Sequence, residues 1–455
     1  MHTSDFTLST SLGLIRGTER EDCKVFLGVP FAHAGRFEYA RLTERLTEDP
    51  AEVFDAKKTG PGCPQNRAVH AHLEHPTRRF YQKEFREGDE FTYQEDCLNV
   101  NIFTPKEAAG CPVILFFYGG GFDSGLNNEN TFDGAGFARR GIVTVFANYR
   151  VGVLGYFTHE ELQKRYGRDG NFGLDDQYQA LRWARMHIAE FGGDPENITL
   201  MGQSAGAISV QYLCLMKENQ GLFKRAVMMS GGGMFPKFAL PKKAEDTHAY
   251  WLEFMKDAGC ESFDEFRTAD LSRLFEAVEK IRAERNDSTF NTMPVVDGVL
   301  LPRPLTEMFK TPLPVGYLLG YSNTDMYAPV MAFIGNRFGK KNNAYIYYFD
   351  LDAPGDDNKA FHAADLRYMF ETFGRSWRPF GDRDREAGAQ LASYVANFAR
   401  TGNPNTDGLP RWKPAGKGPR AEVLKISSSG TRMGRAGYLK LIGNFLRHPE
   451  PADKN

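Results

Sequence analysis

The stretch that most constrains this chain is residues 191–210, FGGDPENITLMGQSAGAISV, which indicates a loop, a strand, a sharp turn and a helix in succession. Residues 197–201 are β-prone, and residues 202–206 form a G-x-S-x-G turn, the strand-to-helix context that presents a nucleophilic serine. Glycines beside Ser204 let neighbouring backbone approach a serine held in a strained conformation. Because such turns also arise by chance, the prediction of a nucleophile depends on finding its partners elsewhere in the chain.

Strands and helices alternate along the chain, which predicts an α/β fold with a doubly wound, mostly parallel central sheet. Residues 112–118 (PVILFFY) and 142–147 (IVTVFA) are continuous apolar runs, as expected for strands buried on both faces of such a sheet. Helices are predicted at residues 174–191, after the elbow serine, and at 385–400. Further strands are predicted at residues 7–16, 23–29, 99–103, 225–229, 315–321 and 344–349, the first two as an N-terminal antiparallel ribbon.

No repeat and no Pro/Gly/Ser linker divides the 455 residues, so we predict a single domain over residues 1–455. A charged, mostly helical block at about 236–290 is predicted to be a cap inserted into it. Residues 60–96 are polar with little periodicity, which indicates a long surface loop. Residues 294–301 (PVVDGVLL) contain an Asp-Gly turn between β-branched residues, which predicts a hairpin.

Composition narrows the choice of partners and compartment. Lys and Arg number 56 against 58 Asp and Glu, so the balance predicts no nucleic-acid partner, and the longest apolar runs are too short to span a membrane. The N-terminal segment MHTSDFTLSTSLG lacks the pattern of a secretory signal, and the six cysteines include no C-x-x-C pair. We therefore expect a cytoplasmic protein with reduced thiols and no zinc site, or a secreted one if an upstream segment has been removed.

A serine hydroxyl needs a base, usually a histidine, and an acid that orients the imidazole. In proteins that carry this turn as a nucleophile elbow, the chain order is serine, acid, histidine. Of ten histidines, only three follow Ser204. His248 lies in the charged helical block with no late strand before it, and His448 lies in a terminal segment expected to fray. We therefore predict that His362, which follows a late strand, is the base; the alternative is a histidine that only caps a helix.

Two aspartates between the serine and this histidine compete for the role of the acid. Asp297 precedes Gly298 in the predicted hairpin turn, and turn chemistry is a sufficient reason for its presence. Asp325 lies just beyond the predicted strand 315–321, where a carboxylate would reach a histidine over the carboxyl edge of the sheet. We predict Asp325 as the acid, against the alternative of an exposed loop aspartate.

The oxyanion that develops on the substrate needs backbone N–H donors already in place. Three consecutive glycines, Gly119, Gly120 and Gly121, directly follow the buried strand 112–118, and without Cβ atoms their amides can turn inward. Ala205, the residue after the nucleophile, supplies a further N–H. We predict an oxyanion hole here; a loop that is merely flexible is the alternative.

Together these residues resemble the type-B carboxylesterases, the cholinesterase-like branch of the α/β-hydrolases, and in particular bacterial para-nitrobenzyl-esterase-like proteins. The resemblance extends over nearly the whole chain. It implies an α/β-hydrolase fold and ester hydrolysis without a metal or cofactor. It implies that Ser204 is the nucleophile, His362 the base and residue 325 the acid, with oxyanion donors at Gly120, Gly121 and Ala205. The motifs that carry it are EDCLNVNI (95–102), FYGGGFDSG (117–125), NYRVGVLGYF (148–157), GNFGLDDQYQALRW (170–183), FGGDPENITLMGQSAGA (191–207), AFHAADLRYMF (360–370) and ANFARTGNPN (396–405).

The sequence departs from this family in several places. The acid at 325 is Asp where the family usually has Glu, and Gln203 stands where a Glu commonly precedes the serine, which removes a charge beside the nucleophile. The resemblance implies a disulfide between Cys63 and Cys97, whereas the lack of a signal predicts reduced thiols. No tryptophan lies between those cysteines, so the sequence does not support stacking of a quaternary ammonium there.

The chain is also short for the family near residues 326–342, where a helical segment usually covers the site. We therefore predict a shortened lid and an open pocket on Phe122, Gln203, Met326, Tyr327, Met331 and Phe333, the apolar members of which could equally be ordinary core.

The sequence thus predicts a serine carboxylic-ester hydrolase that acts through an acyl-enzyme on small soluble esters, as a monomer or weak homo-oligomer. Two alternatives are kept: a cholinesterase-like binding module without catalysis, and a lipase or amidase that uses the same triad. The pocket is made by loops, whose conformation the sequence does not give, so the natural ester is not predicted.

Overall fold

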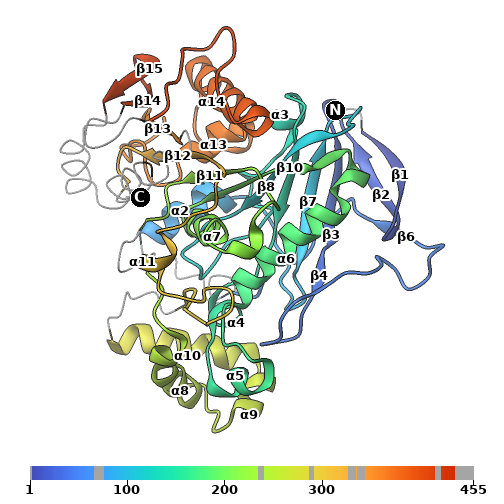
Figure 1. Cartoon of the computed structure of the whole chain (residues 1–455), viewed down its shortest axis with the longest axis vertical. Helices are drawn as coiled ribbons and strands as arrows, with labels where there is room; N and C mark the ends of the chain where they lie inside the picture. Colours follow the sequence, from blue (N-terminus) through green and yellow to red (C-terminus); the bar gives the residue numbers. More distant parts are fainter. Residues whose placement is uncertain are drawn as a thin grey trace.

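The computed structural model describes residues 3–65, 76–233, 240–285, 292–325, 335, 344–415 and 422–435. One large twisted sheet runs through the molecule, from the N-terminal strands on one side to the C-terminal strands on the other (Figure 1). Helices cover both of its faces, and a further group of helices lies beyond one end of the strands (Figure 1).

Thirteen strands from the described residues form this sheet, in the order β1-β2-β3-β7-β9-β8-β10-β11-β12-β13-β14-β15, with β6 paired to β2. β4 (Ala32–His33) and β5 (Arg41–Leu42) form a separate small sheet. The strands of the large sheet are β1 (Ser4–Thr10), β2 (Gly13–Glu19), β3 (Lys24–Pro30), β6 (Val53–Asp55), β7 (Asn99–Thr104), β8 (Cys111–Phe117), β9 (Val143–Ala147), β10 (Gly193–Gln203), β11 (Arg225–Met229), β12 (Gly316–Ser322), β13 (Ala344–Asp350), β14 (Glu422–Ser427) and β15 (Gly430–Arg435).

In the sheet order, the strands from β9 to β14 are parallel to one another, whereas β1, β2, β3, β7 and β9 pair antiparallel in succession, as do β14 and β15; β6 pairs parallel with β2. The chain passes from β8 to β9 on one side of β8 and then to β10 on the other side. The strand order therefore reverses between β8 and β10, and in open α/β sheets the crevice beyond the carboxyl ends of such strands is where ligands bind.

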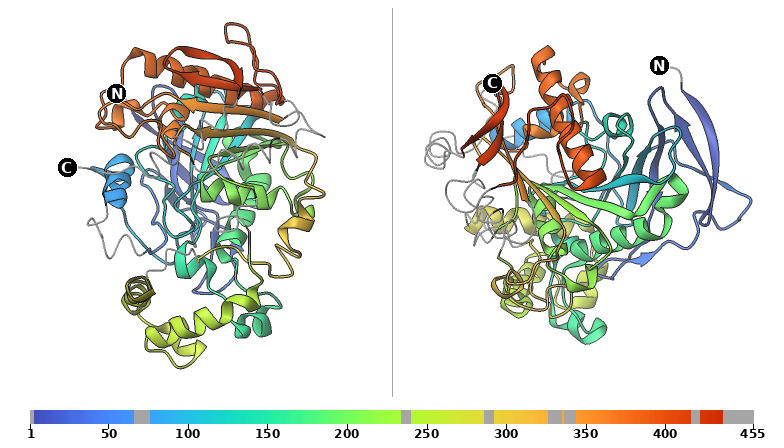
Figure 2. Two further views of the ribbon diagram at one scale, coloured as in Figure 1. Left: turned by 90° about the vertical axis from the view of Figure 1, so that its left-hand side faces the viewer. Right: turned by 45° about the horizontal axis from the view of Figure 1, so that its top comes forward.

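The helices lie in two layers. α6 and α7 cover one face of the sheet, and α3 and α14 cover the other (Figures 1 and 2). α14 ends where Gly402 adopts a left-handed conformation and donates its N–H to Phe398 O at 2.8 Å, a stop that glycine favours. The helices are α2 (Pro76–Arg86), α3 (Ala135–Ala138), α4 (Gly152–Tyr156), α5 (Glu160–Tyr166), α6 (Phe172–His187), α7 (Ala205–Leu213), α8 (His248–Asp257), α9 (Phe263–Thr268), α10 (Leu271–Arg285), α11 (Leu305–Met308), α13 (Asp365–Met369) and α14 (Asp382–Thr401), with 3-10 turns η1 (Ile188–Phe191), η2 (Lys217–Asn219), η3 (Ala244–Thr247) and η4 (Phe373–Arg375).

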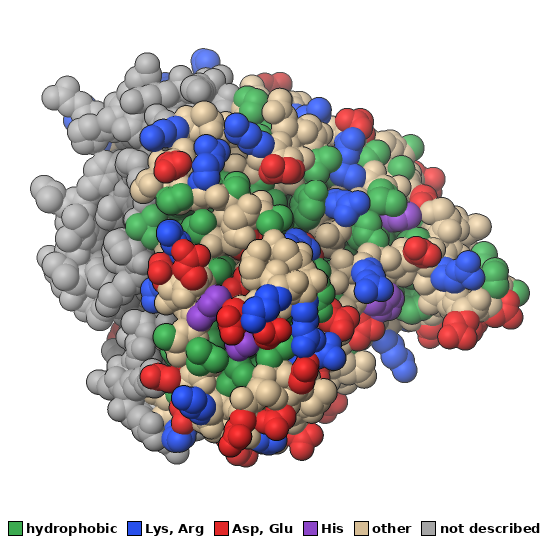
Figure 3. Space-filling view, turned by 60° about the horizontal axis from the view of Figure 1, so that its bottom comes forward, with side chains coloured by type: hydrophobic (Ala, Val, Ile, Leu, Met, Phe, Trp, Pro, Cys, Tyr) green, Lys and Arg blue, Asp and Glu red, His purple; other side chains and the backbone are tan. Residues whose placement is uncertain are grey.

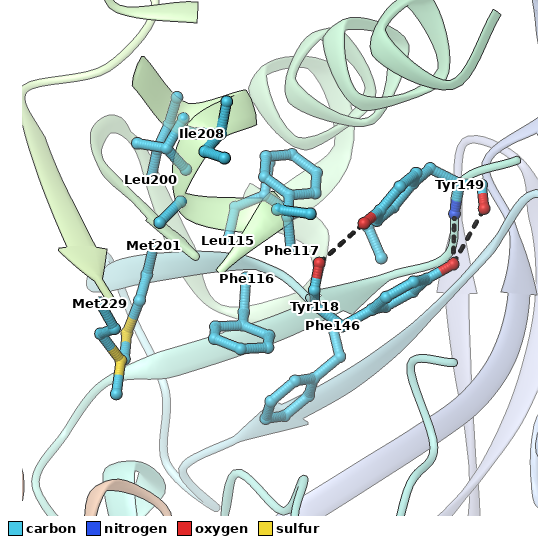
Figure 4. Close-up of a cluster of buried hydrophobic side chains, with 14 of the residues drawn as sticks. Leu115, Phe116, Phe117, Tyr118, Phe146, Tyr149, Leu200, Met201, Ile208 and Met229 are labelled. Atoms are coloured by element: carbon cyan, nitrogen blue, oxygen red, sulfur yellow. Dashed lines mark hydrogen bonds between the residues drawn. The ribbon is translucent and has the colours of Figure 1, made fainter. Parts of the chain in front are cut away.

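The core beneath the carboxyl ends of β8 and β10 is apolar and tightly interlocked (Figure 4). Leu115, Leu200 and Met201 are fully buried between the helical layers. Tyr118 and Tyr149 stack with ring centroids 4.4 Å apart, and each hydroxyl donates to the other residue's backbone carbonyl, at 2.9 and 2.7 Å. Because both hydroxyls are satisfied, two large polar-tipped side chains can be buried at the end of β8.

Helices α8, α9 and α10 lie together at one end of the molecule, in the stretch for which the sequence predicts a cap (Figure 1). Acidic and basic side chains are interspersed on this face, and some of them form ion pairs, such as Arg165 with Asp264 and Lys280 with Asp257 (Figure 3). Among the described residues, no helix is long and apolar enough to cross a membrane.

Three local expectations differ from the structure. Residues 7–16 are not one strand, because a turn at residues 11–12 divides them between β1 and β2. Residues 60–96 are not all loop, because α2 forms within them and buries Phe80 and Glu84. Residues 294–301 turn at Asp297, but neither flank forms a strand. The shortened lid predicted at 326–342 lies, except for residue 335, outside the described residues.

Candidate active site

The elbow predicted at Ser204 is present. β10 ends at Gln203 and α7 begins at Ala205, so Ser204 occupies the turn between them. Its backbone has φ 54° and ψ −121°, a conformation that costs a non-glycine residue free energy. The Ser204 N–H donates to Met229 O at 2.8 Å, which ties the turn to the end of the neighbouring strand β11.

Glycines surround the turn because neighbouring backbone segments approach too closely to leave room for a Cβ atom. A Cβ on Gly206 would lie 2.1 Å from Phe117 O, and one on Gly202 would lie 2.4 Å from the carbonyl carbon of Gly206. A Cβ on Gly231, after β11, would lie 2.2 Å from Ser204 O. No side chain fits at these three positions, so the strained serine is held by its surroundings rather than by its own preference.

The three-glycine loop leaves β8 beside this serine. A Cβ on Gly119 would come within 2.8 Å of Ser204 Cβ, so the loop backbone lies against the elbow. Gly120 and Gly121 have φ of 122° and 66°, and the Gly120 carbonyl accepts from the N–H groups of Asp123 and Ser124 at 3.2 and 3.1 Å. Within the described residues, no acceptor is bonded to the N–H of Gly120 or Gly121. These N–H groups could serve a ligand beside Ser204.

Asp325 and His362 meet on loops from adjacent parallel strands, β12 and β13. His362 Nδ1 lies 3.4 Å from Asp325 Oδ1; the aspartate side chain is fully buried and the histidine side chain is 25% exposed. The two loops are joined by Thr324, whose N–H and hydroxyl both donate to Ala360 O, at 3.3 and 3.2 Å. The pairing expected from chain order is therefore present in the structure, and the shorter Asp reaches the imidazole.

The imidazole contacts the elbow at Gln203, the residue before Ser204: Gln203 Nε2 is 3.3 Å from His362 Nε2. Within the described residues, no hydrogen bond joins Ser204 Oγ to His362, and such bonds are often long in enzymes without substrate. The structure thus brings Ser204, His362, Asp325 and the glycine loop to one edge of the sheet, where its strand order reverses.

A second buried carboxylate lies beside this pair. Asp365 starts α13, three residues after His362, and its Oδ2 accepts from the Tyr347 hydroxyl at 2.6 Å. Burial, reinforced by the negative charge of Asp325, raises the pKa of Asp365 to about 6. Asp365 is not among the residues predicted from the sequence; the signal for it is an acidic residue one helical turn beyond the predicted base.

Helix α2, in a stretch predicted to be loop, packs on the loop that carries His362. The Tyr81 hydroxyl donates to His362 O at 3.4 Å, and the Phe80 and Phe361 rings meet edge-to-face at 4.8 Å. Glu84, from the last turn of α2, binds Arg378 Nε at 2.8 Å, and both side chains are almost fully buried. A polar stretch of little periodicity thus carries Phe80 and Tyr81, which lie four and three positions before Glu84, the spacings that bring side chains together on one side of a helix.

The rejected candidates have ordinary structural roles. His248 Nε2 pairs with Asp169 Oδ2 at 2.6 Å at the start of α8. The Asp297 carboxylate accepts from the N–H groups of Val299 and Leu301 at 3.1 and 2.8 Å, as turn chemistry predicts. His448, like Met326, Tyr327, Met331 and Phe333, lies outside the described residues.

Phe122 is buried, and so are Cys63 and Cys97, the two cysteines for which the family resemblance implies a disulfide. Phe122 is 2% exposed and packs edge-to-face on Tyr156 at 5.3 Å, so it has a packing role whatever it does for a substrate. Cys63 and Cys97 are fully buried free thiols in contact with each other. Their hydrogen bond, with burial, raises the pKa of Cys97 well above its usual value, so the Cys97 thiol stays protonated at neutral pH. Among the described residues, no cluster of three or more His, Cys, Asp or Glu side chains could hold a metal.

Comparison with known proteins bears on this arrangement. The family model described as the Carboxylesterase family matches residues 4–330 and 324–440. The chain belongs to this family. It is therefore a carboxylic ester hydrolase of the type-B group, as the sequence motifs predicted.

Individual relatives of this carboxylesterase are distant but align over nearly its full length. The para-nitrobenzyl esterase of Bacillus subtilis (strain 168) is 26% identical over 489 residues, which cover 93% of this chain and 95% of that protein. Carboxylesterase 4A of Bos taurus is 26% identical over 537 residues, covering 95% and 93%. A solved thermophilic PNB esterase superimposes with a TM-score of 0.81 at 23% identity over 96% of this chain and all of that one, which shows the α/β-hydrolase fold.

Proposed function

We propose that this carboxylesterase hydrolyses small soluble esters through an acyl-enzyme formed on Ser204. The observation that carries the proposal is the strained Ser204 between the glycine loop and the His362–Asp325 pair. A nucleophile, a base with its orienting acid, and backbone donors are the parts that acyl transfer needs. The proposed triad is Ser204, His362 and Asp325, with oxyanion donors at the N–H groups of Gly120, Gly121 and Ala205.

In the first half-reaction, Ser204 Oγ attacks the ester carbonyl carbon while His362 Nε2 takes the hydroxyl proton. The carbonyl electron pair moves onto oxygen, where the N–H donors stabilise it. The carbon–oxygen bond to the alcohol then breaks, and His362 returns the proton to the leaving oxygen. Asp325 accepts the Nδ1–H bond throughout and stabilises the imidazolium.

In the second half-reaction, water takes the place of the alcohol. His362 removes a proton from the water, whose oxygen attacks the acyl carbon, and the bond to Ser204 Oγ breaks as the proton returns to it. The acid leaves and the enzyme is restored. Gln203 and Phe122, which adjoin the elbow and the glycine loop, are proposed to border the substrate, together with the predicted pocket residues Met326 and Tyr327.

The proposal is tested with p-nitrophenyl acetate and butyrate. Ser204→Ala is expected to lower kcat by at least about 10^4-fold, because the variant lacks the hydroxyl on which the acyl-enzyme is proposed to form. A fluorophosphonate probe is expected to label Ser204 in the wild type. Activity that survives in Ser204→Ala refutes the proposed nucleophile, and a wild-type protein that neither cleaves esters nor reacts with the probe would be a non-catalytic member of the fold.

The acid is tested separately, because two buried carboxylates lie near the histidine. Asp325→Asn is expected to lower kcat by about 10^3- to 10^4-fold, since an amide favours the wrong imidazole tautomer. The turn residue gives the control: Asp297→Asn is expected to change kcat by less than about threefold. If Asp365→Asn is the more damaging change, the acid has been misassigned.

A further inference from the structure

Gln203 links two parts of the site. It is the last residue of β10, it is 4% exposed, and its Nε2 lies 3.3 Å from His362 Nε2. Its Oε1 faces the glycine loop, where a Cβ on Gly119 would approach it to 2.6 Å. The carboxamide therefore fills the space between the loop of the proposed oxyanion hole and the imidazole of the proposed base.

This contact defines the state of the histidine. An amide nitrogen only donates, so His362 Nε2 must be the acceptor in this bond. A neutral imidazole has one N–H, which then lies on Nδ1, the nitrogen 3.4 Å from Asp325 Oδ1. Gln203 and Asp325 thus hold opposite sides of the ring in the tautomer that a general base for Ser204 requires.

The same contact occupies the lone pair that Ser204 needs. An imidazole nitrogen has one lone pair, so Nε2 cannot accept from Gln203 and Ser204 at the same time. A protonated ring would place its own N–H against the N–H of Gln203, and two donors that face each other repel. In the described part of the chain, the acidic groups near the ring are Asp325 and Asp365, and Tyr81 and Tyr347 reach the histidine loop and Asp365 with their hydroxyls. Among these groups, Gln203 is the one that turns an N–H toward Nε2.

We propose that Gln203 is a positioning residue that holds His362 in the Nδ1–H tautomer in the free enzyme and yields Nε2 to Ser204 when an ester binds. This rests on the proposed function of Ser204 and His362. It also assigns a role to the position where the family commonly has Glu: a carboxylate could only accept from Nε2–H, whereas the amide donates to the bare nitrogen.

Two variants test the donor. We expect Gln203→Glu to lower kcat/KM for p-nitrophenyl acetate about tenfold more at pH 6 than at pH 8, relative to wild type, because the carboxylate stabilises the protonated ring. Gln203→Met is similar in length but has no donor, and its ratio of kcat/KM at pH 6 to kcat/KM at pH 8 is expected to be about threefold lower than that of the wild type. Asp365 titrates in all three proteins, so its effect cancels in the comparison.

A merely structural role would lower activity equally at all pH values. The inference is overturned if both variants keep the wild-type ratio of pH 6 to pH 8 activity, whether or not their overall activity falls. Thermal unfolding of both variants at pH 6 and pH 8 shows whether a change of ratio comes from unfolding, and a ratio explained in that way also overturns it. Failure of the proposed function is recognised independently, because Ser204→Ala would then retain activity.

Discussion

The two halves of the site are held in place by different means. The elbow is fixed by backbone against backbone: Gly202, Gly206 and Gly231 leave no room for a Cβ, and the Ser204 N–H is bound to β11. The histidine side is fixed by side chains from far along the chain. Buried charges and aromatic rings join α2 to the histidine loop around residues 361–378.

The difference determines how each half should fail. Close backbone packing has no flexible group that can move aside, so an added methyl group must displace main chain. A buried ion pair tolerates small changes of shape, but it leaves an uncompensated charge when one partner is removed. The elbow should therefore be sensitive to volume and the histidine side to charge.

The largest expected effect is on the histidine side. In Glu84→Ala, Arg378 stays buried and keeps only Asp356 of the two carboxylates that lie 2.8 Å from it, and the buried Arg367 loses Glu84 at 3.8 Å. Because two buried guanidinium groups lose a carboxylate, we expect the free energy of unfolding to fall by about 4 kcal/mol. Asp352→Ala is the matched control, because its pair with Lys359 lies in the same region but is about half exposed, and it should cost less than about 1 kcal/mol. Urea denaturation measures both. Equal losses of stability in the two variants would show that the histidine side is not especially sensitive to the removal of a buried charge.

The next effect tests the elbow. A methyl group at Gly206 would meet Phe117 O at 2.1 Å, so we expect Gly206→Ala to destabilise the protein by about 3 kcal/mol and to abolish ester cleavage. Gly374→Ala is the control, because Gly374 is exposed and has open space around its added Cβ. A Gly206→Ala protein with normal stability would show that the elbow backbone can move.

A smaller effect concerns the buried carboxyl of Asp365. Its folded-state pKa, about 6, lies above the ordinary value of 3.8, so ionisation opposes folding. This penalty is absent well below pH 3.8, grows as pH rises and is complete above about pH 6. Asn keeps an acceptor for Tyr347 without the charge, so Asp365→Asn should gain about 2 kcal/mol more stability at pH 7.5 than at pH 4.5. The same gain at both pH values would contradict the raised pKa.

The smallest effect comes from the hydroxyl that α2 places on the histidine loop. The bond from Tyr81 to His362 O is long, at 3.4 Å, so Tyr81→Phe is expected to lower kcat by no more than about fivefold and stability by about 0.5 kcal/mol. Steady-state kinetics and urea denaturation measure the two effects. A loss as large as that of Glu84→Ala would mean that the hydroxyl, and not the buried charge, holds the loop.

Where a signal is contiguous, the sequence predicted the structure well. The strand 225–229 has the bounds of β11, the apolar run 112–118 differs from β8 by one residue at each end, and the G-x-S-x-G turn lies between β10 and α7. Chain order then selected His362 and Asp325, which the structure places 3.4 Å apart. In each case the signal is either local, such as backbone conformation or apolar periodicity, or it is the order of the elements along the chain.

Only the tertiary structure revealed what surrounds the proposed triad. Helix α2 lies in a stretch with too little apolar periodicity to predict it, because part of its buried face is Glu84, a charge that is buried only when paired with Arg378. Asp365 contacts Tyr347, 18 positions away in the sequence, and Gln203 contacts His362, 159 positions away. The sequence by itself determined which residues are candidates for the chemistry. Which groups surround them was decided by folding, because burial and the pairing of charges depend on distances between residues that only the folded chain brings together.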